Sequence, residues 1–483
     1  MVRHGFLDDL AFIAYQQYRL SQALEPRGSS VSRGSPVEPS IFLDFHLPNA
    51  ATWLYFSLIL SLSIFFQFTR PFSLRNLDLI MLFMPVPGFL LLQEAHNLLA
   101  AGKLGGGQGK LVLAYGWLLA GAAYWLVRAI VDLSLVRRPP LNPNLTTSGL
   151  TCLGLALFVG LTSVAVRRTG DAPQPLQVGR APAPIEQVQD QAAAAVQQAQ
   201  NGNLYAAAPE EVRFWVERTL AMVCHAAIVM GLVLMGWHHF QDQAVGVAMG
   251  TLYLLVPYTA FDVGRQLHHV WPTTFLIWAI YSYRRPIVAG WLLGLATGTA
   301  LFPALLLPLW FGFYSRRGAS RFGLAFIIAV LLSVGITSLV LWLDGRAGYG
   351  LTAVLSLPEW QPWQVPQTES IWTGAHWAYR MPIFVLFVSF VAVVTVWPSP
   401  KNLSHLIALS AAILIGIQFW HGDRGGVYVL WYLPLLLLMV FRPNLTLAEP
   451  PRPEPGTGLM ARLASVAWRR VWPRPEPPKE LAV

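Results

Sequence analysis

The chain has 483 residues, of which 55% are apolar and only 12% are charged, whereas a soluble domain carries roughly 25% charged residues. Apolar runs of about 18–25 residues recur along it, the length needed to cross roughly 30 Å of hydrocarbon, which excludes an ordinary soluble protein. The net charge of +9 does not predict a nucleic-acid partner, because the basic residues lie in short loops beside the apolar runs, a pattern that orients membrane proteins.

The fold class predicted from these runs is all-α: a polytopic helical membrane bundle of about 11–13 spans. Before the first run, residues 1–50 combine an amphipathic segment with a linker rich in Gly, Ser and Pro. The predicted spans are 51–68, 77–99, 111–135, 147–166, 216–237, 244–261, 270–283, 287–314, 322–343, 380–397, 403–420 and 426–441. Residues 51–146 are predicted to form a three-span added module, residues 147–441 a transmembrane core, and residues 442–483 a basic, Pro-rich cytoplasmic tail.

Residues 287–314 are predicted to be a broken pair of half-helices. Arginine pairs precede and follow this segment, at 284–285 and 316–317, and Pro303 interrupts its middle. A single crossing would place one pair on the wrong side of the membrane, and proline breaks a helix. We therefore expect the chain to turn back near Pro303.

The distribution of Lys and Arg then gives a topology. The basic loops 69–76, 137–144, 284–286, 316–321 and 398–405, with the tail, are predicted to be cytoplasmic. The loops 167–215, 262–269, 344–379 and 421–425 are predicted to be external. Lys103 and Lys110 are the exceptions, since this scheme places them outside.

Two segments outside the spans are expected to be helical. The stretch "IEQVQDQAAAAVQQAQ" within 167–215 has strong helix formers and is predicted to lie on the outer membrane surface; a plain linker between two bundles is the alternative. The tail contains "GLMARLASVAWRRVW", whose apolar and arginine residues predict an interfacial helix on anionic lipid.

The stretch "FDVGRQLHHVWPTT" (261–274) collects polar side chains between two apolar segments. Ionisable residues that gather beside membrane spans are costly and tend to be functional. Arg265 can pair bidentately with a phosphate, and Gln266, His268 and His269 follow it. An ordinary polar loop at the interface is the alternative.

Two further external segments carry candidate ligand-binding side chains. The loop 344–379 contains Trp372 and His376 among several tryptophans, whose faces stack on sugar rings; an aromatic belt at the bilayer surface is the alternative. The turn "QFWHGDRGG" contains His421 and Arg424. The histidines of these segments have no metal-ligand spacing, so no metal site is predicted.

Inside the membrane, Arg128 and Asp132 are four residues apart and are predicted to form a structural ion pair on one helix face near the cytoplasmic end. The chain contains no P-loop, Rossmann fingerprint, HExxH or GxSxG motif, which argues against NTP-driven and serine-hydrolase chemistry.

The run "GRQLHHVWPTTFLIWAIYSYRRPIVAGWLLGLATGTALFPALLLPLWFGFYSRR" and the upstream "QAAAAVQQAQNGNLYAA" resemble the bacterial polyprenol-phosphate-mannose-dependent α-mannosyltransferases of the GT-C superfamily. The similar region covers roughly residues 147–441. The chain departs from that family where Leu301-Phe302 replaces a lysine before the kink proline, and where its "GQ-x-N" turn reads Gly264-Arg265-Gln266-Leu267-His268.

The resemblance implies an inverting sugar transfer, with a mannose-like sugar, from a lipid-linked donor to an acceptor on the outer face of the membrane. Asp190 or Asp171 would serve as general base, and Arg265 with Gln266 and His268 would hold the phosphate. No metal or other cofactor is required, and the implied location is the bacterial inner membrane. The alternative is a non-catalytic transporter, flippase or scaffold with a GT-C-like bundle.

Overall fold

The computed structural model describes residues 50–135, 143–167, 184–200, 209–260, 267–315, 318–343, 360–364, 371–372, 375–421, 428–445 and 448–449. The predicted N-terminal amphipathic segment and the predicted interfacial helix of the tail lie outside these residues.

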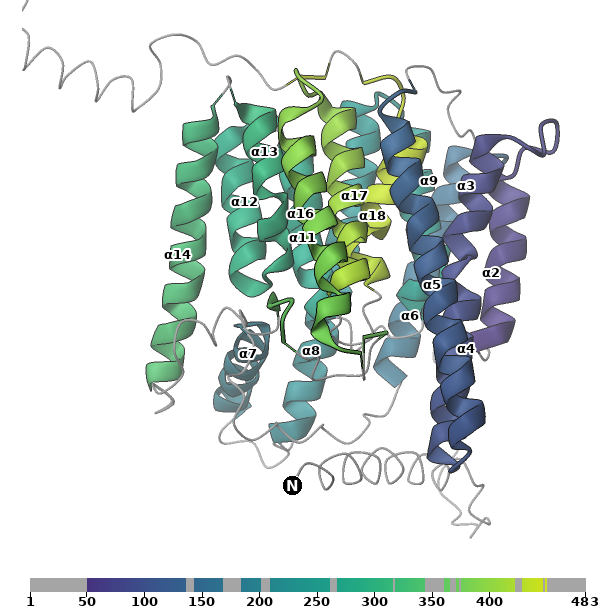
Figure 1. The fold of residues 1–483 in the computed structure, drawn as a ribbon, viewed down its shortest axis with the longest axis horizontal. Helices are drawn as coiled ribbons and strands as arrows, with labels where there is room; N and C mark the ends of the chain where they lie inside the picture. The colour runs from purple at the N-terminus through teal and green to yellow at the C-terminus, as the bar shows by residue number, and fades with distance from the viewer. Residues whose placement is uncertain are drawn as a thin grey trace, which may run out of the picture.

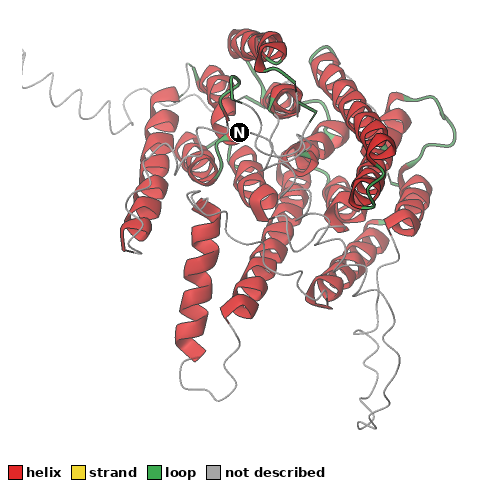
Figure 2. Ribbon diagram, turned by 60° about the horizontal axis from the view of Figure 1, so that its bottom comes forward, coloured by secondary structure: helices red, strands yellow, loops and turns green. Residues whose placement is uncertain are grey.

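Helices make up the described chain, and no strand is present among its residues (Figures 1 and 2). Among the described residues, seven helical segments are long and apolar enough to cross a membrane, and there are five shorter apolar helices of 10–17 residues. The predicted all-α, multi-pass bundle is therefore confirmed. The elements are α2 (Ala50–Phe65), α3 (Leu74–Phe83), α4 (Pro85–Ala100), α5 (Leu104–Asp132), α6 (Thr147–Arg167), α7 (Pro184–Gln200), α8 (Pro209–Leu234), η1 (Met235–His239), α9 (Gln243–Leu255), α10 (Pro257–Ala260), α11 (Leu267–Tyr281), α12 (Pro286–Thr299), η2 (Phe302–Leu306), α13 (Leu307–Tyr314), α14 (Ala319–Leu343), η4 (Trp377–Tyr379), α16 (Met381–Val396), α17 (Leu403–Trp420) and α18 (Val429–Phe441).

The described parts of the predicted cytoplasmic loops gather at one end of the bundle, the upper end in Figure 1. The Asn144 side chain donates to the Ser63 and Phe66 carbonyls at 3.1 Å each, which joins the start of α6 to the end of α2. The Leu403 amide donates to the Ala448 carbonyl at 2.8 Å, which joins the start of α17 to the segment after α18. We call this the basic end.

The segment 287–314 folds back on itself, as predicted. It forms α12, the tight turn η2 that contains Pro303, and α13. The Tyr314 hydroxyl at the end of α13 donates to the Tyr283 carbonyl just before α12, at 2.6 Å. Both ends of this helical hairpin therefore lie at the basic end.

Glycines set how closely the hairpin packs on α14. Gly290, Gly294 and Gly298 follow one another every fourth residue on α12. A Cβ atom on Gly290 would lie 2.3 Å from the Phe322 carbonyl oxygen, and one on Gly294 would lie 2.6 Å from that of Phe326. The missing side chains let the two backbones touch, as small residues do in membrane helix pairs.

The predicted three-span module consists of α2 to α5. Its second span is one apolar stretch, Leu74–Ala100, divided into α3 and α4 at Pro85, where a proline ring favours a new helix start. The third span, α5, packs along α17 of the core. α17 is buried along nearly its whole length, so it forms the centre of the bundle.

The starts of α11 and α5 differ from the sequence-based expectation. α11 begins at Leu267, so His268 and His269 lie in the first turn of a helix rather than in the predicted loop 262–269. α5 begins at Leu104, about seven residues before the predicted span. Lys110 is consequently on a helix, where its ammonium pairs with the Glu94 carboxylate of α4.

The predicted topology has a direct test. We expect the basic end to face the cytoplasm and α7 to face outside. Single cysteines at Ala195 on α7 and at Arg285, both exposed, are introduced into a chain whose Cys152 and Cys224 are replaced by alanine. A membrane-impermeant maleimide should label position 195 in intact cells and position 285 only after lysis. Labelling of position 285 in intact cells would contradict this orientation.

Candidate functional site

Aromatic and histidine side chains converge where several short helices end, away from the basic end. α12 has 14 residues and so reaches about 21 Å, less than the ~30 Å of a hydrocarbon core. The tip of the hairpin, the start of α11, the start of α18 and the end of α17 meet at this level. We call the group formed by His269, Phe302, Trp360, Trp420, His421, Tyr428 and Trp431 the aromatic–histidine cluster.

A three-ring stack forms the middle of the cluster. The Trp431 indole lies between Phe302, with ring centroids 3.8 Å apart, and Tyr428, with centroids 3.9 Å apart, and both pairs are nearly parallel. Phe302 stands at the turn of the broken helix, while the other two begin α18. The stack therefore fixes the hairpin tip against the start of α18.

Two histidines flank this stack. The His421 ring is parallel to the Trp360 indole, with centroids 4.0 Å apart and an angle of 8° between the planes. The His269 ring lies 5.6 Å from Tyr428 and 5.9 Å from Trp431. The structure thus brings together His269 and His421, which are 152 residues apart in the chain.

Two indole N–H groups of the cluster are buried without an acceptor in the described chain: those of Trp420 and Trp431. Their side chains are almost fully enclosed, and a buried donor without a partner costs free energy. An oxygen-rich group beside these rings would satisfy the donors. The aromatic faces suit a sugar ring or an isoprenoid chain.

The other predicted binding residues have different positions. Trp372 donates its indole N–H to the Phe419 carbonyl at 3.2 Å, beside the cluster. His376 is exposed, and its Nδ1 accepts from the Ala378 amide at the start of η4. His268 is half-buried in the first turn of α11.

The predicted general bases are not both within the described chain. Asp190 lies on α7, where Arg213 of α8 pairs with its carboxylate at 3.2 Å. The helix that carries Asp190 was predicted, and it packs on α8, α12 and α14. Asp171, Arg265, Gln266 and Arg424 lie outside the described residues.

Within the described ranges, no three His, Cys, Asp or Glu residues are grouped closely enough to hold a metal ion. The two cysteines are free, Cys152 on the outside of the bundle and Cys224 buried.

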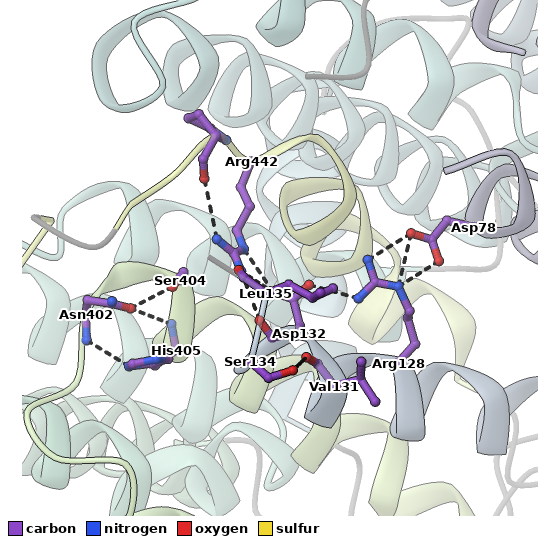
Figure 3. A network of polar contacts seen from close by, with 11 residues as sticks. Asp78, Arg128, Val131, Asp132, Ser134, Leu135, Asn402, Ser404, His405 and Arg442 are labelled. Atoms are coloured by element: carbon purple, nitrogen blue, oxygen red, sulfur yellow. Dashed lines mark hydrogen bonds and ion pairs between the residues drawn. The ribbon is translucent and has the colours of Figure 1, made fainter. Parts of the chain in front are cut away.

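A second polar group, at the basic end, is an alternating chain of buried charges (Figure 3). Arg128 donates to both Asp78 oxygens at 2.9 and 3.1 Å, and to Asp132 at 2.9 Å, which confirms the predicted helix-face pair. Arg442 donates twice to the other Asp132 oxygen, at 2.9 and 2.6 Å. We call Asp78, Arg128, Asp132 and Arg442 the buried charge network.

This network joins the module to the end of the core rather than forming a reactive site. Each carboxylate is saturated by guanidinium N–H groups, and Asp78 also accepts from the Tyr124 hydroxyl at 2.8 Å. Burial, together with the neighbouring Arg128 charge, lowers the pKa of Arg442 to about 10. Arg442 therefore remains protonated at neutral pH, and the contact persists.

Sequence reasoning did not find several members of the cluster. Trp420, Tyr428 and Trp431 are not predicted as site residues, because nothing in their local spacing separates them from a span. The break at Pro303 was the available signal: a helix that ends within the bundle presents the residues at its tip to neighbouring elements.

The fold, with its aromatic–histidine cluster and its buried charge network, is that of a polytopic membrane protein with several short helices in its core. No protein-family profile, curated protein or solved structure matches the chain.

Proposed function

We propose that the chain is a membrane glycosyltransferase of GT-C type that moves a mannose-like sugar from a polyprenyl-phosphate donor to an acceptor outside the cytoplasm. The observation that supports this proposal is the aromatic–histidine cluster at the tip of a broken hairpin, away from the basic end. A lipid-linked sugar has ring faces that stack on aromatic side chains and oxygens that accept hydrogen bonds from imidazole and indole N–H groups.

In this proposal the donor's sugar and phosphate lie against the cluster. The indole N–H groups of Trp420 and Trp431 donate to oxygens of the donor, and His269 and His421 add further hydrogen bonds. Arg265 with Gln266 holds the leaving phosphate, as cationic groups stabilise negative charge that develops in a transition state. His268, Trp372, His376 and Arg424 complete the predicted binding set.

Transfer needs one carboxylate to take the proton of the acceptor hydroxyl as the new glycosidic bond forms and the polyprenyl phosphate leaves. Asp190 or Asp171 is the proposed base. Of the two, Asp190 lies within the described residues, where its carboxylate pairs with Arg213 of α8. The proposed location is the bacterial inner membrane.

The cluster gives the first test of this proposal. Trp431→Ala should weaken binding of a radiolabelled polyprenyl-phosphate mannose to the detergent-purified protein by tenfold or more, since it removes both the stacking surface and an N–H donor. Trp342→Ala is the matched control, because Trp342 lies on α14 and is 64% exposed. Equal affinities of the two variants would argue against the cluster as the donor site.

Asp190→Asn separates transfer from binding. If Asp190 is the base, this variant should retain donor affinity and lose sugar transfer. Donor binding by the unaltered protein with no transfer to any acceptor would instead favour the alternative, a non-catalytic lipid-binding or flipping protein.

Arg265 gives a second prediction. A guanidinium that holds the phosphate should contribute about 1.5–3 kcal/mol to binding, so Arg265→Ala should weaken donor affinity roughly tenfold to a hundredfold. Arg265→Lys should recover only part of this loss, because lysine lacks the planar fork. Affinity is measured beside a thermal melt; unchanged affinity with an unchanged melt would make this stretch an ordinary polar turn.

A further inference from the structure

Arg75 is a buried cation at the basic end that the buried charge network leaves without a partner. It lies in the first turn of α3 and is only 8% exposed. Within the described chain, neither of its terminal nitrogens, Nη1 and Nη2, has a hydrogen-bond acceptor. A buried charge is costly unless it is paired.

The nearby carboxylates are already occupied. Asp78, one turn further along the same helix, binds Arg128 through both oxygens and accepts from Tyr124. Asp132 binds Arg128 and Arg442. Two carboxylates and two guanidiniums balance in this network, so Arg75 is an additional positive charge beside a neutral group.

The start of α3 adds to this positive character. Ser73 caps the helix, with its hydroxyl accepting from the Asn76 amide. The Asn76 side chain donates to the carbonyls of Gln67, Arg70 and Pro71, which holds the preceding turn in place. A helix N-terminus carries partial positive charge and binds anions, and Arg75 lies in the first turn of this helix.

We propose that Arg75 and the N-terminal turn of α3 bind a phosphate group at the basic end of the bundle. A guanidinium matches phosphate oxygens bidentately, so a phosphate would accept from both Nη1 and Nη2. Its source is either the headgroup of an anionic lipid or free phosphate. This site is at the end opposite the aromatic–histidine cluster and does not depend on the proposed transferase function.

The test uses the full chain, purified in detergent and washed free of lipid. Binding of phosphatidylglycerol is measured by native mass spectrometry, and a neutral diacyl glycolipid without phosphate serves as the lipid control. Arg75→Gln should weaken phosphatidylglycerol binding roughly tenfold to a hundredfold. Arg70→Gln is the matched control, since Arg70 is exposed on the turn that precedes α3, and it should bind like the unaltered protein.

Inorganic phosphate distinguishes the two sources. A rise in melting temperature with phosphate alone supports a site open to the free anion, whereas a rise with phosphatidylglycerol only supports a lipid headgroup site. Arg75→Gln should abolish either rise without lowering the melting temperature of the ligand-free protein, because the variant removes an uncompensated charge.

Two results would overturn the proposal. The first is equal phosphatidylglycerol binding by Arg75→Gln, Arg70→Gln and the unaltered protein. The second is a lower melting temperature of ligand-free Arg75→Gln with no response of the unaltered protein to phosphate, which would mean that Arg75 has a partner in its own chain. If Arg75→Gln cannot be purified, Arg75→Lys keeps the charge and should weaken binding partially; unchanged binding there would also count against the site.

Discussion

Asp132→Asn should destabilise the protein by about 3–5 kcal/mol, the cost of removing one partner from a buried ion pair. Asp132 is 1% exposed and accepts from both Arg128 and Arg442. The substitution preserves shape but leaves two guanidiniums without their shared carboxylate. Unfolding of the detergent-solubilised protein, followed by circular dichroism during titration with sodium dodecyl sulfate, measures the loss.

The exposed pair of Glu94 and Lys110 provides the control. Their side chains are 54% and 37% exposed, so Lys110→Gln should change stability by less than about 1 kcal/mol. Combining Asp132→Asn with Arg442→Gln should cost less than the sum of the two single effects, because both disrupt one contact. Strict additivity, or a loss below 1 kcal/mol in Asp132→Asn, would refute a stabilising network.

Gly294→Leu should prevent α12 from docking on α14 and cost at least about 3 kcal/mol, above the usual range for overpacking. The reason is that even a Cβ atom would stand 2.6 Å from a backbone oxygen of Phe326, and a backbone cannot move aside as a side chain can. The variant should show a large drop in folded yield on size-exclusion chromatography and in melting temperature.

Gly335→Leu is the matched control for this substitution. Gly335 lies on α14, where nothing stands within 4 Å of an added Cβ atom, so its replacement should leave yield and melting temperature nearly unchanged. A similar loss in both variants would show that leucine at a helical glycine is harmful in itself, and would remove the argument for close packing.

Much of the architecture could be predicted because span length and the placement of charge act locally. α17 has the predicted ends, Leu403 and Trp420, since an apolar run flanked by polar residues has only one stable position in a bilayer. The hairpin followed from arginine pairs at both ends and Pro303 between them. Neither inference required knowledge of distant contacts.

The candidate site could be predicted only in part, because it is assembled from distant segments. Polar clustering in the sequence pointed to His269 and His421, but their shared neighbour Tyr428 carries no local signal. The contact between Asp132 and Arg442 joins residues 310 positions apart, which no local pattern can show. The sequence likewise predicts a regular span over 216–237 and does not predict the π-helical turn η1 over Met235–His239.

That turn lies in close contact with α9. A Cβ atom on Gly236 would lie 2.2 Å from the Gly246 Cα atom, so η1 and α9 touch backbone to backbone. The His239 ring nitrogen Nε2 lies 2.8 Å from the Tyr281 carbonyl oxygen, which ties the widened turn to the end of α11. Spacing alone does not reveal such a bulge.

The hairpin of α12 and α13 also bears on how the protein is made. Because it enters and leaves at the same end, it adds no net crossing, and the sidedness of α14 and all later helices is the same whether or not it has inserted. Neither half, at 14 and 13 residues, is long enough to be a stable span alone. During biogenesis the two halves must therefore insert together, and they are free to do so late, after the longer helices around them are in place.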